Sequence, residues 1–158
     1  LYIVNSVQEE VGLNGAKMIA ESLKPNVAII TDVAHDTTTP MINKREYGDY
    51  KCGGGPILTY AAAVHNKLLN MIIDTADKHK IPFQRDAASR GTGTDTDAFA
   101  FAAGGIPSAL ISLPLRYMHT TVETADQHDV EHVIKLMYET LLQLDPKFNI
   151  KKKKKRLE

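Results

Sequence analysis

The sequence predicts an α/β fold, a three-layer sandwich in which a mostly parallel central sheet is covered by helices on both faces. Two patterns along the 158 residues predict it. Short apolar runs rich in Val, Ile and Leu alternate with longer segments whose apolar residues recur at helical spacing. Because the connection between two parallel strands has to cross a face of the sheet, this alternation is typical of parallel sheets flanked by helices.

Five segments have the composition of β-strands. The first, LYIVNSV, is apolar from its first residue, with no initiator Met or polar segment before it. We therefore expect the fold to be incomplete at the amino end of this chain. The expected strands are residues 1–7, 27–32, 55–59, 81–85 and 109–113.

Four segments with helical spacing lie between and after these strands. Pro25 ends the first helix and Pro82 follows the second, because proline does not continue a helix. Asp95 is the expected N-cap of the third helix, which ends at Gly104, and Asp129 is the expected N-cap of the fourth. The expected helices are residues 15–23, 66–80, 95–103 and 129–144.

The chain has 19 basic and 19 acidic side chains, but the basic ones gather at its end. Without the run from Lys151 to Arg156 and the final Glu158, residues 1–150 carry a net charge of −5. We expect residues 1–150 to form one domain and residues 151–158 to be a disordered basic tail, whose last two residues resemble a cloning scar. An acidic body argues against nucleic acid as a partner.

Two further features of the composition bear on where in the cell the protein is expected. Its longest apolar runs are far shorter than the roughly 20 residues that cross a bilayer, so no membrane partner is expected. Cys52 is its only cysteine, which excludes an internal disulfide framework and favours the reducing cytoplasm.

Polar side chains follow three of the expected strands. Glu9 and Glu10 come after the first, Asp32 ends the second, and His119 lies a few residues beyond the last. In an open α/β sheet, ligands collect beyond the carboxyl ends of the strands. Two adjacent carboxylates, an Asp and a His would suit hydrolytic zinc chemistry, but adjacent glutamates are more often a solvated surface pair.

The local sequences around these residues are more informative than their spacing alone. The segments VQEEVGLNGA, AIITDVAHDTTTP, GGGP, GTDTDAF and ISLPLRYMHTTVE occur in this order. Together they resemble the glutamyl aminopeptidase or tetrahedral aminopeptidase family of cocatalytic metallopeptidases, whose relatives are sometimes labelled endoglucanase M. The resemblance covers residues 1 to about 144. It implies a zinc-peptidase-like fold, of which this chain is the carboxyl-terminal part of the catalytic domain.

The resemblance also implies a role for each polar residue. Glu9 matches the general base, and Glu10 matches a metal ligand. Asp32 matches a ligand of the other metal, and His119 matches the histidine ligand. The implied cofactor is a pair of divalent ions, Zn or Co, and the implied activity is removal of amino-terminal residues from peptides. Consecutive residues point in different directions, so Glu10 can bind metal while Glu9 stays free to take a proton.

The glycine-rich turn before the third expected strand is a further candidate site. No Lys followed by Ser or Thr comes after it, as a phosphate-binding loop requires. Glycine lets the backbone approach a ligand closely, and the resemblance places this turn at the substrate cleft. We therefore expect Gly54 and Gly55 to contact the peptide.

The chain departs from the family in one respect. Members also supply a His-x-Asp motif, a bridging Asp and an oligomerisation domain upstream of the QEE word, and none of these precedes Leu1. We expect the chain alone to be inactive and the full-length form to be a homo-oligomer. Two alternatives stay open: an endoglucanase-type glycosidase that uses Glu9 and Asp32 without metal, and a non-catalytic domain for binding or assembly.

Overall fold

The computed structural model describes residues 1–144 and 150, and the expected basic tail over residues 151–158 lies outside the described residues. The helices are α1 (Asn14–Leu23), α2 (Lys44–Tyr47), α3 (Asn66–Lys78), α4 (Asp95–Phe101) and α5 (Gln127–Leu141). The strands are β1 (Ala28–His35), β2 (Ile57–Tyr60), β3 (Gln84–Ala87), β4 (Ser108–Arg116) and β5 (Thr124–Ala125).

The strands form one sheet in the order β1-β4-β2-β3, with β5 paired to β4. β1 and β4 pair in parallel along the whole of β1, from Ala28 opposite Ser108 to His35 opposite Leu115. β2 and β3 are also parallel, whereas the β2–β4 and β4–β5 pairs are antiparallel. The long pairing with β4 explains why β1 continues three residues beyond the strand end expected from sequence.

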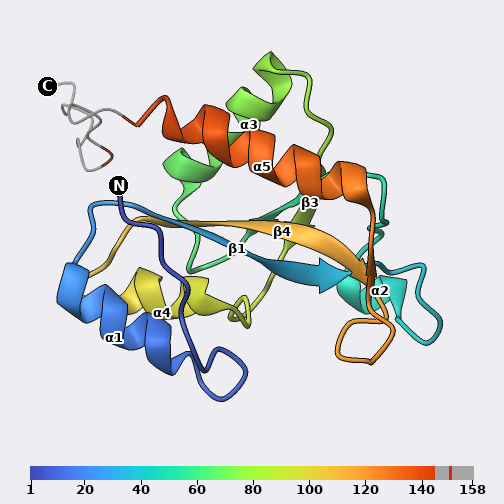
Figure 1. The fold of residues 1–158 in the computed structure, drawn as a ribbon, viewed down its shortest axis with the longest axis horizontal. Coiled ribbons are helices and arrows are strands. Elements are labelled where there is room, and N and C mark those ends of the chain that lie inside the picture. The colour runs from blue at the N-terminus through green and yellow to red at the C-terminus, as the bar shows by residue number, and fades with distance from the viewer. Residues whose placement is uncertain (145–149, 151–158) are drawn as a thin grey trace, which may run out of the picture.

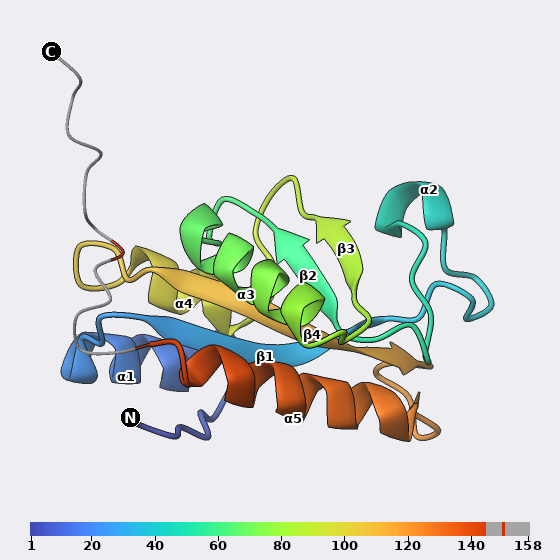
Figure 2. The same ribbon diagram turned by 90° about the horizontal axis from the view of Figure 1, so that it is seen from above.

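Helices cover both faces of this sheet, as expected for a three-layer α/β fold. Figure 1 shows α1 and α4 on one face and α3 and α5 on the other, and Figure 2 shows α5 running along β1 and β4. The core is built from apolar side chains of the sheet and of the helices on both faces, all of them at most 3% exposed: Ala16, Leu58, Leu68, Leu69, Ile72, Leu110, Ile111 and Leu136. No helix in the described part of the chain is long and apolar enough to cross a membrane.

The strand expected over residues 1–7 is wrong. This segment pairs with no strand of the described chain, and Leu1 and Ile3 are more than 90% exposed. A strand needs a hydrogen-bonded neighbour, and an apolar run shows only that a segment is able to pair.

The helix caps differ from those expected, because the neighbouring residue makes the capping bond. The Thr94 side chain, and not Asp95, accepts the backbone N–H of Thr96 at the start of α4. The Asp126 side chain, and not Asp129, accepts the N–H of His128 at the start of α5. The carboxylates of Asp95 and Asp129 instead accept hydrogen bonds from residues outside their own helices.

Candidate active site

A tight turn carries Glu9 and Glu10 into α1. The carbonyl oxygen of Glu9 accepts the N–H groups of Gly12 and Leu13, and that of Val7 accepts the N–H of Gly15 at 3.0 Å. A Cβ on Gly15 would lie 2.5 Å from the Val7 oxygen, so only glycine allows this approach. Because the sequence predicts a catalytic role for Glu9, we call residues 7–13 the catalytic turn.

Asp32 lies in β1, three residues before the strand ends. Its carboxylate is partly buried, and Oδ1 accepts the N–H of Val33 at 2.7 Å. The parallel neighbour β4 places Ser112 opposite Asp32. The two strands therefore run on together toward the loops that follow them.

His119 lies in the turn after β4 and meets the catalytic turn. Its Nε2 lies 3.2 Å from Oε1 of Glu10, although the two residues are 109 positions apart in sequence. The backbone of His119 is left-handed, with φ 64°, and its N–H donates to Glu123. The structure thus brings Glu10 and His119 into contact, and their roles as metal ligands stay a prediction.

Electrostatic interactions join these groups into one cluster. Partial burial raises the pKa of the Glu9 carboxyl group, and the nearby charges of Asp32, Glu10 and Asp95 raise it further, against the opposing effect of His119. Burial also raises the pKa of Asp32, and Asp95 and Glu10 add to this, whereas the Val33 N–H and His119 lower it. Glu9 and Asp32 are therefore within electrostatic range of each other and of Glu10 and His119.

The cluster has the donor types of a metal site. Two carboxylates and one imidazole suit Zn²⁺ or Co²⁺, and the excess of negative charge around Asp32 is the kind that a cation offsets. In residues 1–144 and 150, however, no three His, Cys, Asp or Glu side chains are set at the spacing that holds an ion. The residues fit a metal ion by their donor types, and of the three expected ligands Glu10 and His119 are the pair in contact.

The charge of Asp95 also acts on Glu9 and Asp32, although the sequence favoured a helix cap for Asp95 about equally with a contact to substrate. Its Oδ2 accepts a hydrogen bond from the Ser6 hydroxyl group, and its Oδ1 is buried without a partner among the described residues. The GTDTDAF word contains Asp95, but nothing local in the sequence connects it with Ser6, which is 89 positions away.

The glycine-rich turn is held by a buried carboxylate. Asp129 is fully buried, and its two oxygens accept the N–H groups of Gly53 and Gly55, each at 2.7 Å. A Cβ on Gly55 would lie 2.0 Å from the carbonyl oxygen of Pro82. Packing inside the protein thus accounts for Gly55, and the contact of Gly54 and Gly55 with substrate stays a prediction.

Asp129→Ala is expected to lower the free energy of unfolding by roughly 3 kcal/mol, because the buried N–H of Gly55 and the partly buried N–H of Gly53 lose a charged acceptor. Urea unfolding at pH 7 measures this loss. Asp126→Ala removes only the α5 cap and should cost about 1 kcal/mol. A loss for Asp129→Ala no larger than that of this control would show that the turn does not depend on Asp129.

Two side chains near the site are not arranged for catalysis. Burial and the neighbouring Asp36 raise the pKa of the Cys52 thiol to about 11, so it stays protonated and is a poor nucleophile. The His35 ring packs edge-on against Tyr47, with ring centroids 5.5 Å apart, and burial lowers its pKa. This agrees with a packing role for His35.

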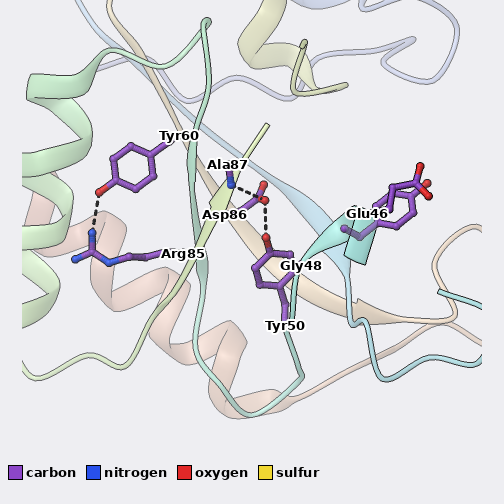
Figure 3. Close-up of a pocket in the computed structure, with 8 residues that line it drawn as sticks. Glu46, Gly48, Tyr50, Tyr60, Arg85, Asp86 and Ala87 are labelled. Atoms are coloured by element: carbon purple, nitrogen blue, oxygen red, sulfur yellow. Dashed lines mark hydrogen bonds between the residues drawn. The ribbon is translucent and has the colours of Figure 1, made fainter. Parts of the chain in front are cut away.

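One surface pocket lies elsewhere, at the β3 edge of the sheet. It has a volume of about 360 Å³, and none of the site residues named above lines it. Figure 3 shows its two hydrogen bonds between side chains, from Tyr50 to Asp86 at 2.6 Å and from Arg85 to Tyr60 at 2.7 Å. Both carboxylate oxygens of Asp86 have donors, because Thr59 binds the second at 3.2 Å. The polar side chains of the pocket wall are therefore hydrogen-bonded to one another, which gives them a structural role.

Comparison with known proteins agrees with this arrangement. Residues 1–136 match the family model described as M42 glutamyl aminopeptidase. A lysyl aminopeptidase of Pyrococcus furiosus is 37% identical over 146 residues, which are 92% of this chain and 41% of that protein. The chain spans about two-fifths of the length of the curated relatives that it matches most fully.

Solved structures share the fold. A TET aminopeptidase from a marine sediment archaeon of the Thaumarchaeota superposes with a TM-score of 0.81 at 34% identity, covering 89% of this chain and 40% of that one. The TET1 peptidase of Pyrococcus horikoshii, which can assemble into a tetrahedron or a large octahedral shell, gives a TM-score of 0.65 at 28% identity, covering 86% and 38%. The zinc-peptidase-like fold expected from sequence is confirmed by these superpositions.

Proposed function

Because this chain belongs to the M42 glutamyl aminopeptidase family, we propose that it forms part of a metal-dependent aminopeptidase that removes amino-terminal residues from peptides. The observation that carries the proposal is the convergence of three separate segments. The turn with Glu9 and Glu10 contacts the turn with His119 through the Glu10–His119 pair, and Asp32 of β1 is near enough for its charge to act on Glu9. Such a meeting of acids and an imidazole fits a hydrolytic site.

In this proposal the two adjacent glutamates have different tasks. Glu10 is in contact with His119 and is placed to bind metal with it, and Asp32 supplies a carboxylate for the second ion. A pair of divalent ions, Zn²⁺ or Co²⁺, supplies Lewis acidity and lowers the pKa of bound water. Glu9 is partly buried and makes no hydrogen bond through its side chain among the described residues. It is free to take the proton from water and pass it to the leaving amine.

The proposal also includes partners and setting. Peptides with a free amino terminus are the substrates, and the family description suggests acidic terminal residues while the P. furiosus relative suggests basic ones. The shells formed by the P. horikoshii relative suggest a homo-oligomer. A single cysteine with its thiol unpaired suits the cytoplasm.

Hydrolysis of aminoacyl-p-nitroanilides by the natural polypeptide that contains this sequence tests the proposal. Glutamyl and lysyl substrates should be cleaved, their N-acetylated counterparts should not, and a chelator should abolish the activity until Zn²⁺ or Co²⁺ is returned. Residues 1–158 alone should bind Zn²⁺ weakly and be inactive.

Two outcomes would contradict the proposal. Metal-independent cleavage of carboxymethylcellulose would show a glycosidase, in which Glu9 and Asp32 act as the carboxylate pair. Failure of the metal-loaded polypeptide to cleave either substrate would favour the non-catalytic role.

A further inference from the structure

The amino-terminal segment is held to the rest of the protein at few points. Residues 1–5 are exposed, and Ser6 and Glu9 are the partly buried residues among the first ten. The backbone hydrogen bonds of the catalytic turn stay within the turn or reach the first residues of α1. Besides the bonds to α1, which include those of the Asn14 side chain, two hydrogen bonds join residues 1–13 to the rest of the described chain: Ser6 to Asp95, and Glu10 to His119.

These two bonds differ in how well they can fix the turn. The side chains of Glu10 and His119 are 74% and 64% exposed, and exposed charged pairs contribute little because water screens them. The bond from Ser6 to Asp95 is partly buried. Of the two bonds that reach beyond α1, it is therefore the stronger tie between the catalytic turn and the body of the protein.

Asp95 is a firm point of attachment. It is the first residue of α4, and its neighbours Thr94 and Thr96 are buried and hydrogen-bonded to each other at 2.9 Å. α4 packs against α1, β1 and β4. The side chain of Asp95 is consequently attached to the same sheet that carries Asp32.

The chemistry of Asp95 points to a role other than stability. Its Oδ1 is buried with no hydrogen-bond partner, and a buried carboxylate oxygen without a donor is costly. Asp97, in the same helical turn, differs: its oxygens accept the N–H groups of Thr92 and Gly93. The free-energy cost of the unpaired Oδ1 is explained if Oδ2 of Asp95 holds a segment whose position matters for function.

Ser6, the residue that Asp95 holds, lies next to the turn that carries Glu9. Ser6 lies three residues before Glu9, and Gln8 between them has a left-handed backbone with φ 61°. Such a conformation is strained outside glycine and persists only where its surroundings impose it. Without the bond at Ser6, the chain before Gln8 has no side-chain anchor to another element of the described protein.

We propose that Asp95 is a positioning residue: by accepting the Ser6 hydrogen bond it fixes the catalytic turn and thereby sets where the Glu9 carboxylate stands. Its effect on rate rests on the function proposed above, but its effect on the turn does not. A displacement of about 1 Å at a reacting group can cost on the order of 100-fold in rate.

Kinetics of five variants in the natural polypeptide test the positioning. Ser6→Ala and Asp95→Ala should each lower kcat about 10-fold or more with little change in KM, and the double variant should be no worse than either. Ser6→Thr keeps the hydroxyl and Asp95→Asn keeps an acceptor oxygen, so each should retain at least about half of the kcat. Additive losses, or loss of kcat in Asp95→Asn equal to that in Asp95→Ala, would overturn the proposal.

Amide hydrogen exchange in the metal-free protein gives a readout that does not depend on activity. The amides of Gly12, Leu13 and Gly15 should exchange about 10-fold faster in Ser6→Ala and Asp95→Ala, while those of α3 stay unchanged and show that the fold is intact. Asp97→Asn, the matched control, should leave the turn amides protected. Unchanged protection in Asp95→Ala would overturn the proposal. If the turn amides exchange faster in Asp95→Ala but the natural polypeptide has no peptidase activity, only the proposed function is contradicted.

Discussion

Glu9→Gln is expected to lower peptide hydrolysis at least about 100-fold, the scale of a positioned general base, while the metal content stays near that of the wild type. Glutamine has the shape of glutamate but cannot accept the proton from water. The substitution leaves Glu10 and its contact with His119 untouched. Turnover of a glutamyl or lysyl p-nitroanilide, together with metal analysis of the same sample, measures both quantities.

The matched control for this variant is Glu131→Gln, on the exposed side of α5. It makes the same chemical change away from the cluster and should keep the wild-type rate. If Glu9→Gln retains most of the turnover in a preparation free of wild-type enzyme, another group takes the proton. A joint loss of metal and activity would instead place Glu9 among the ligands.

The layers of the fold were predictable because they depend on periodicity. Alternating strand and helix patterns indicated a parallel sheet with helices on both faces, and the β1–β4 and β2–β3 pairs have this arrangement. The segment over residues 1–7 has the composition of a strand but no neighbour in the described chain. Composition shows what a segment can do, whereas pairing depends on residues elsewhere.

The candidate site was predictable where its residues lie in distinctive sequence motifs. Glu9 and Glu10 in VQEEVG, and His119 in RYMH, are located by such words, and the structure brings Glu10 and His119 into contact. The link between Ser6 and Asp95 was not predictable, because a Ser near a strand and an Asp at a helix start both have ordinary local explanations. Only the fold shows that the two meet.

His119→Ala is expected to lower the affinity for Zn²⁺ at least about 100-fold, because the site loses its only imidazole among Glu10, Asp32 and His119, and catalytic zinc sites generally use three protein ligands per ion. Competition with a chromophoric chelator, using Zn²⁺ alone, measures the change. Loss of the ring should leave the fold intact, since the side chain is 64% exposed.

His128→Ala is the control for this measurement. His128 is also exposed, and its ring contacts only the Asp126 cap of its own helix among the described residues. Its removal should leave Zn²⁺ affinity unchanged, so the difference between the two variants isolates the imidazole at the cluster from general loss of a surface histidine. Equal affinities for His119→Ala and His128→Ala would remove His119 from the metal site. The contact between Glu10 and His119 would then be an exposed surface contact, worth at most about 1 kcal/mol.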